Sequence, residues 1–150
     1  MPILEWQFPS VPGAAPSAAL AVRGPILPVT VAPLISHVAP GMSTPAPVSG
    51  YALIDTGVAM TSVDESVCKS LGLVPSGAVP LGHAGGTGVH YCYPVEIAFP
   101  GTQLPPFQQP MAVSVNLQSQ SPIIVLFGRD LLSVIKFTYN GVQGRFEIAF

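Results

Sequence analysis

The chain has 150 residues, a length that favours a single domain, and only 8% of them are charged while 49% are hydrophobic. The formal net charge is −2 and the five basic residues are scattered, so binding to nucleic acid is not expected. No apolar run free of Pro and Gly is long enough to predict a membrane span. The low charge predicts an apolar surface that a partner chain or an apolar substrate covers in the working state.

Proline marks the N-terminal part of the chain. Residues 1–19 are rich in Pro, Ala, Ser and Gly, which predicts an extended arm in front of a main domain, residues 20–150. The arm has neither the basic segment nor the continuous apolar segment of a secretory signal. Residues 20–34 have the composition of a strand, but Pro25 and Pro28 favour a strand start or a strand at a sheet edge.

The middle of the chain predicts strands, one helix and a hairpin. Residues 51–54 form an apolar run typical of a buried strand, and residues 58–63 are again strand-like. The clearest helix spans residues 64–73, with a capping Asp at its start and a Gly near its end. Residues 79–91 predict a β-hairpin with a glycine-rich tip.

The C-terminal part predicts more strands and a short helix. Residues 93–99 and 111–117 alternate apolar residues with others, as half-buried strands do. The apolar run 123–128 predicts a buried strand, and residues 129–135 predict a short helix or turn. The pair Asn140-Gly141 predicts the turn of a closing hairpin.

The chain has two cysteines, one in the predicted helix and one in a predicted strand. Cys68 and Cys92 form no C-x-x-C pair, and no Cys/His spacing suits a metal, so we predict neither a metal site nor a cofactor. Two free, packed thiols favour a reducing compartment, and we expect a cytoplasmic location.

One carboxylate stands out by its position. The stretch Ala52-Leu53-Ile54-Asp55-Thr56-Gly57 runs from a buried strand into Asp-Thr-Gly. Taken alone, an Asp-x-Gly after a strand is usually only a turn. Later in the chain a second apolar run ends in Leu126-Phe127-Gly128-Arg129-Asp130-Leu131-Leu132, and the glycine-tipped hairpin lies between the two motifs.

In this order the two motifs and the hairpin resemble the retropepsin-like aspartic proteases, the family of the retroviral proteases and their single-domain bacterial relatives. The resemblance covers residues 20–150. It implies an all-β fold: a closed retropepsin-like β-barrel, mostly antiparallel, with one or two short helices and a flap hairpin.

The resemblance also implies roles for individual residues. Asp55 is the expected catalytic residue, and Thr56 and Gly57 are expected to support the catalytic loop. The flap that offers backbone groups to an extended peptide is expected at Ala84, Gly85 and Gly86. Structural support for the loop that carries Asp55 is expected from Leu126, Phe127, Gly128 and Arg129.

The chemistry implied by the family needs two carboxylates around one water, one acting as base and the other as acid. Like charges in contact cannot both ionise cheaply, so the pair shares a proton. The chain has one Asp-Thr-Gly, and Asp130 is in no second triad, so we expect a homodimer in which Asp55 of each copy meets at the two-fold axis. The expected activity is that of an aspartic endopeptidase cleaving extended apolar peptide segments of a peptide or protein substrate at acidic to mildly acidic pH.

Two positions depart from the family pattern. Val58 follows the triad where a small residue such as Ala is more usual, and it could narrow the cleft. Ala59 stands where retroviral members place an Asp that pairs with the arginine, here Arg129. Asp64 or Glu65 is the candidate replacement for that partner. The alternatives are therefore a catalytically weak dimerisation or peptide-binding module of the same fold, and a precursor whose Pro-rich arm covers the cleft until it is cut.

Overall fold

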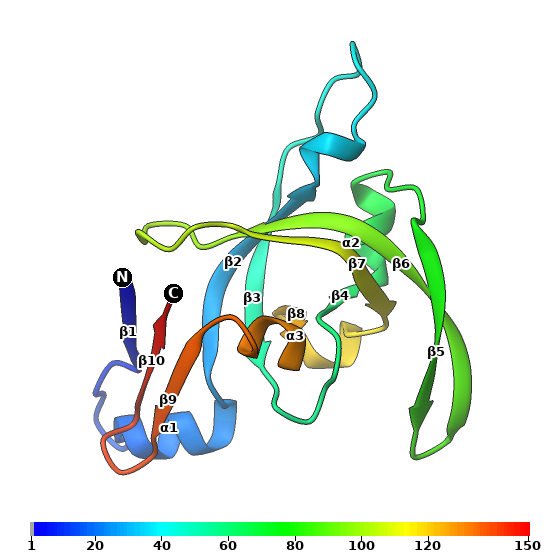
Figure 1. Ribbon diagram of the computed structural model, residues 1–150. Helices are drawn as coiled ribbons and strands as arrows, with labels where there is room; N and C mark the ends of the chain where they lie inside the picture. Colours follow the sequence, from blue (N-terminus) through cyan, green and yellow to red (C-terminus); the bar gives the residue numbers. More distant parts are fainter. Residues whose placement is uncertain (1) are drawn as a thin grey trace.

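The computed structural model describes residues 2–150, and of His83 the backbone alone. Strands dominate the described residues, and the helices among them are short, which confirms the expected all-β class. The strands form two sheets. The first and the last strand lie together in a small sheet at one side of the molecule, and a larger, curved sheet lies beside it (Figure 1). No helix in residues 2–150 has the length and apolar character needed to cross a membrane.

The larger sheet closes on itself. Its strands, in spatial order, are β2 (Ile26–Pro33), β3 (Val48–Ile54), β8 (Ile123–Phe127), β4 (Ser62–Asp64), β7 (Phe107–Val115), β6 (Gly86–Ala98) and β5 (Gly77–His83). β2 also pairs with β6, so the strands from β2 round to β6 form a ring. β5 pairs antiparallel with the first part of β6 and extends from the ring as a hairpin (Figure 1).

Strand β2 shows why this sequence tolerates proline inside a sheet. Leu27, Val29 and Val31 are buried and alternate with half-buried residues, which is the period of a strand with one face on the core. Pro28 lies opposite Tyr51 of β3, whereas the pairing of β2 with β6 begins only at Thr30. Pro28 therefore has a strand neighbour on one side, which is the edge setting that the sequence predicted.

The N-terminal region differs from the sequence prediction. β1 (Ile3–Gln7) pairs with β10 (Arg145–Ala149), which in turn pairs with β9 (Lys136–Asn140). Residues Pro16–Arg23 form the helix α1, so the extended arm does not continue to residue 19 and the strand does not begin at residue 20. Proline suits the first turn of a helix, and burial of Leu20 in the core stabilises the helical turn that carries it.

The predicted helix after Asp55 is present as α2 (Glu65–Ser70). Asp64 caps it by accepting the N–H of Ser66 at 2.8 Å, and Gly72 follows its end with φ of +63°. The strand predicted over residues 58–63 is shorter, because only Ser62–Asp64 joins the sheet as β4. The remaining short elements are α3 (Arg129–Leu132), η1 (Ile35–His37) and η2 (Gln118–Gln120).

An aromatic cluster fixes the C-terminal end of β8 in the core. Phe127 is fully buried, with its ring centroid 5.8 Å from that of Phe99 and 6.2 Å from that of Phe107. Phe99 and Phe107 flank the connection from β6 to β7, on the opposite side of the ring from β3. The residue that precedes Gly128 is thus held by one ring just after β6 and another at the start of β7.

Candidate active site

The two sequence motifs meet at the ends of two parallel strands. β3 and β8 run side by side in the same direction, with Ile54 opposite Phe127. The residues that follow, Asp55 and Gly128, therefore leave the sheet at the same edge. The backbone N–H of Asp55 donates to the carbonyl oxygen of Phe127 at 2.9 Å, so the residue implied as catalytic is bonded directly to the second motif.

The loop of residues 55–61 crosses the end of β8. It starts after β3 on one side of β8 and ends at β4 on the other side, where Ser62 pairs with Leu126 (Figure 1). Three backbone N–H groups at the start of α3 also donate to this loop: Arg129 N to Val58 O at 2.8 Å, Asp130 N to Ala59 O at 3.2 Å, and Gly128 N to Thr61 Oγ1 at 3.2 Å. The loop is consequently bonded to the second motif from its first residue to its last.

The carboxylate of Asp55 is oriented by its own loop. The N–H of Gly57 donates to Asp55 Oδ1 at 2.8 Å, and the N–H of Val58 donates to the Asp55 carbonyl at 3.2 Å. A side chain at position 57 would bring a Cβ to 3.1 Å from that same carboxylate oxygen, so glycine keeps the approach open. Asp55 is half-buried, while Thr56 and Gly57 are exposed. Asp-Thr-Gly therefore lies at the surface, while hydrogen bonds to the backbone of its own loop and of Phe127 hold Asp55 in place.

Arg129 contacts the loop, but not through an ion pair. Its Nη1 donates to the carbonyl oxygen of Thr56 at 2.8 Å. The expectation that Asp64 or Glu65 replaces the missing acidic partner is wrong, because Asp64 caps α2 and Glu65 lies 3.8 Å from Lys69. Arg129 therefore interacts with the Asp-Thr-Gly backbone directly, as a hydrogen-bond donor.

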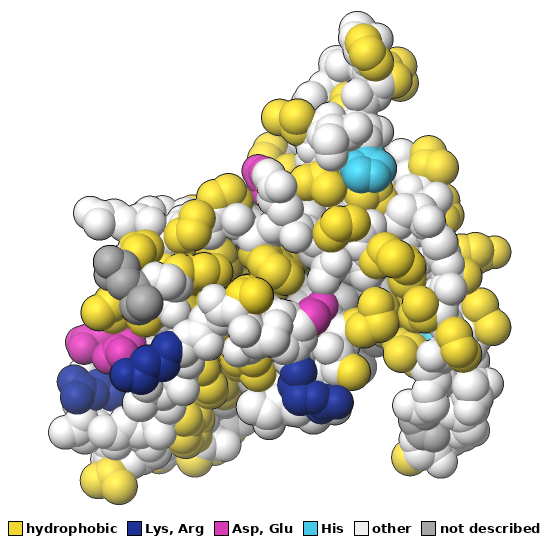
Figure 2. All heavy atoms as spheres, in the orientation of Figure 1, with side chains coloured by type: hydrophobic (Ala, Val, Ile, Leu, Met, Phe, Trp, Pro, Cys, Tyr) yellow, Lys and Arg dark blue, Asp and Glu magenta, His cyan; other side chains and the backbone are white. Residues whose placement is uncertain are grey.

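The glycine-tipped hairpin lies on the same side of the molecule as the loop. β5 and β6 pair up to His83 and Gly86, which leaves Ala84 and Gly85 as the exposed tip. Gly86 has φ of +124°, a conformation that favours glycine. Both the tip and the loop between β3 and β4 lie at the lower edge in Figure 1, and Figure 2 shows an open notch between the hairpin and the body of the molecule, with hydrophobic side chains around its upper end.

A cluster of polar residues behind the loop has no counterpart in the sequence interpretation. Asp130 accepts hydrogen bonds from Thr61, Gln109 and Leu131, and Thr61 is fully buried. The signal that could have pointed to it is Asp130 itself, a carboxylate inside the second apolar motif. Its partners come from β7 and from the far end of the loop, so no local pattern identifies them.

The thiols are far from nucleophilic at neutral pH. Burial, with the charge of Asp64 as the next cause, raises the pKa of the Cys68 thiol to about 11, and burial also raises the pKa of Cys92. A protonated thiol is a weak nucleophile, so neither cysteine is a candidate nucleophile. Among the side chains that the structure describes, which do not include His83, no cluster of three His, Cys, Asp or Glu is placed to hold a metal ion.

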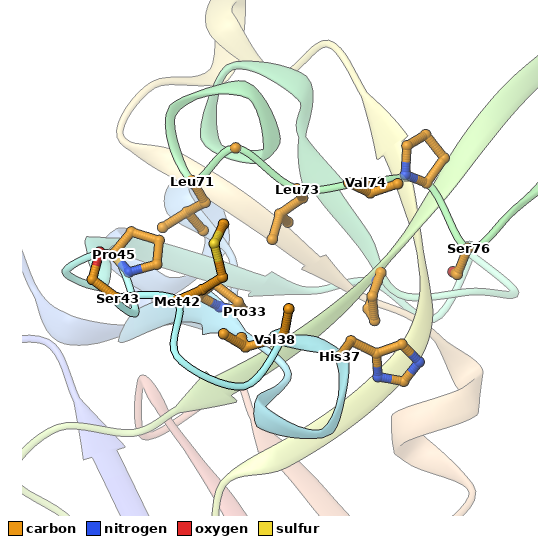
Figure 3. Close-up of a pocket in the computed structure, with 14 residues that line it drawn as sticks. Pro33, His37, Val38, Met42, Ser43, Pro45, Leu71, Leu73, Val74 and Ser76 are labelled. Atoms are coloured by element: carbon orange, nitrogen blue, oxygen red, sulfur yellow. The ribbon is translucent and has the colours of Figure 1, made fainter.

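Two cavities lie away from Asp55. One of about 570 Å³ opens between the loop after η1 and the segment from α2 to β5, where Met42, Leu71 and Leu73 point toward one another (Figure 3). Another cavity, of about 650 Å³, is lined by residues that include Trp6 of β1, Arg23 of α1, Tyr51 of β3 and Ile123 of β8. Neither is lined by a residue of the loop 55–61.

No protein-family model and no curated protein matches this chain.

Proposed function

We propose that the chain is a retropepsin-type aspartic endopeptidase that acts as a homodimer. The observation that supports this is the bonding of the Asp55-Thr56-Gly57 loop to the end of β8, from Phe127 O at one end to Gly128 N at the other. A surface turn would need no such support. A loop that must place a carboxylate against its copy across a two-fold axis does need it.

The proposed reaction uses one water and the two Asp55 carboxyls, which hold one proton between them. The ionised carboxylate takes a proton from the water as the water oxygen bonds to the peptide carbonyl carbon. The protonated carboxyl gives its proton to the carbonyl oxygen. As the C–N bond of the tetrahedral intermediate breaks, the leaving nitrogen takes the proton that the base carboxyl had accepted. One hydroxyl of the intermediate returns its proton to the other carboxylate, which forms the C=O of the product acid and leaves one proton on the pair again. No cofactor takes part in this scheme.

The hairpin supports an extended, apolar substrate. In this proposal a peptide lying over Asp55 contacts the backbone at the tip, Ala84 and Gly85, and at Gly86 where β6 begins. On β6, the side chains of Val89 and Tyr91 are 76% and 61% exposed, and such apolar exposure favours a partner that covers it. This exposed apolar surface supports the proposal that the cleavage sites are flanked by apolar residues.

The proposed partner is a second copy of the chain, and the proposed location is a reducing compartment. Because each chain has one Asp-Thr-Gly, the proposed pair of carboxylates requires a second copy of the chain. With only 8% charged residues, the chain is suited to burying a large part of its surface against that copy. The two cysteines are free and buried, which favours a reducing compartment such as the cytoplasm.

Peptide-library cleavage by the wild type and by Asp55→Asn tests the proposal, together with the mass of both proteins by light scattering. We expect the wild type to cleave at acidic to mildly acidic pH, and Asp55→Asn to form the same dimer without cleaving. A wild type that stays monomeric at every concentration would refute the mechanism. Equal inertness of both proteins with retained peptide binding would favour the alternative, a binding module in which Val58 narrows the cleft.

A further inference from the structure

The carboxylate of Asp130 is the meeting point of three separate parts of the chain. It accepts four hydrogen bonds, from Thr61 N at 2.8 Å, Thr61 Oγ1 at 2.7 Å, Gln109 Nε2 at 2.7 Å and Leu131 N at 2.8 Å. Thr61 ends the loop that begins at Asp55, Gln109 belongs to β7, and Leu131 belongs to α3. Asp130 therefore ties the catalytic loop to the sheet and to the second motif at once.

The number of donors around Asp130 suits a carboxylate. A carboxylate is acceptor-only and its two oxygens can take four donors, which matches the four donors present. An amide at position 130 would turn one oxygen into an NH₂ group. That group would face the backbone N–H of Thr61 or of Leu131, and one donor would lose its acceptor.

The bonds also fix the direction of the Thr61 hydroxyl. Because Thr61 gives its hydroxyl proton to Asp130 Oδ1, its oxygen is free to accept the N–H of Gly128 at 3.2 Å. Thr61 is 0% exposed, so water does not replace either bond. Loss of the Asp130 acceptor would loosen Thr61 and with it the end of the loop that lies over β8.

We propose that Asp130 is a positioning residue for Asp55, fixing the far end of the 55–61 loop while Phe127 fixes the near end. The inference rests on the proposed endopeptidase function, in which two Asp55 carboxyls must meet closely enough to share a proton. Displacing a reacting group by about 1 Å can reduce a rate by about 100-fold. Asp130 acts through Thr61 and does not touch the substrate.

The kinetic test compares Asp130→Asn with Asp64→Asn. Asp64 is the matched control, a buried carboxylate that accepts from Ser66 and Leu117 at the start of α2. Both variants remove one negative charge and break a carboxylate network. Per folded dimer, we expect Asp130→Asn to lower kcat by about 10- to 100-fold with KM within about twofold of the wild type, and Asp64→Asn to leave kcat within about twofold. Equal kcat in the two variants would overturn the proposal.

Gln109→Glu tests the same positioning role if Asp130→Asn does not fold. In Gln109→Glu, the introduced carboxyl donates to Asp130 while it is protonated, as the amide does, whereas its ionised form repels Asp130. We expect kcat of this variant, relative to the wild type, to fall as the pH rises through the titration of the introduced carboxyl. A ratio that does not change with pH would overturn the proposal, because a purely structural Gln109 gives no such pH dependence.

Hydrogen exchange separates failure of this inference from failure of the proposed function. A wild type that cleaves no peptide refutes the endopeptidase, but the exchange of the loop amides can still be measured. In Asp130→Asn we expect the amides of Thr61 and Gly128 to exchange at least about tenfold faster while those of α2 stay unchanged, and the reverse in Asp64→Asn. Unchanged exchange at Thr61 and Gly128 would refute the positioning role by itself.

Discussion

Gly128 lies directly against the backbone of Met60. A Cβ on Gly128 would come within 2.7 Å of the Met60 carbonyl carbon and within 3.0 Å of the Met60 and Thr61 nitrogens. These are backbone atoms, which cannot rotate away as the end of a side chain can. The glycine of the second motif is therefore required by the loop that follows the first motif.

Substitution Gly128→Ala should cost about 1–3 kcal/mol of unfolding free energy, because the loop must move to admit the methyl group. The same movement displaces the end of the Asp55 loop, so peptide cleavage should fall as well. Urea unfolding measures the first effect and kcat the second. Gly82→Ala is the control for stability, since a Cβ there meets nothing within 4 Å. Equal stability of the two variants would contradict the close contact.

Thr61→Val replaces a buried hydroxyl with a methyl group of nearly the same size. The N–H of Gly128 then loses its acceptor and Asp130 loses a donor, so we expect a loss of about 1–3 kcal/mol by urea unfolding. Thr61→Ser keeps both bonds and should cost less. Equal losses in the two variants would show that the methyl group, and not the hydroxyl, carries the stability.

Arg129→Met tests the bond from Nη1 to the Thr56 carbonyl. The side chain is exposed, so we expect a change in unfolding free energy below about 1 kcal/mol. We expect kcat to fall, because the Asp-Thr-Gly backbone loses a donor that restrains it. Lys69→Met removes the same charge from α2 and should leave kcat unchanged. A Lys69→Met variant as slow as Arg129→Met would attribute the effect to net charge.

The raised pKa of Cys68 predicts a loss of stability in alkali. A thiol whose pKa rises from 9.0 in the unfolded chain to about 11 in the fold binds its proton more tightly when folded. Its contribution is therefore complete below pH 9 and is lost as the pH rises from there through 11, by up to about 2 kcal/mol. Urea unfolding of the wild type and of Cys68→Ala from about pH 8 to about pH 11 measures the difference. A constant difference would contradict the prediction.

The sequence predicted most of the elements that local patterns specify. The helix after Asp64 has its cap and its closing glycine close together in the chain, and the hairpin around Ala84 and Gly85 has its glycines at the tip. Such signals act within a few residues. The same approach missed α1, because burial of Leu20 in the core outweighs a Pro- and Gly-rich setting.

The sequence by itself determined which residues are candidates: one Asp-Thr-Gly at the end of an apolar strand, and a second apolar motif ending in glycine. Their catalytic role stays a prediction. Only the tertiary structure decided that β3 and β8 are parallel neighbours, that Gly128 must lack a side chain, and that Asp130 gathers four donors. Those facts depend on the pairing of strands far apart in the chain, and strand pairing is set by packing of the whole sheet rather than by any local pattern.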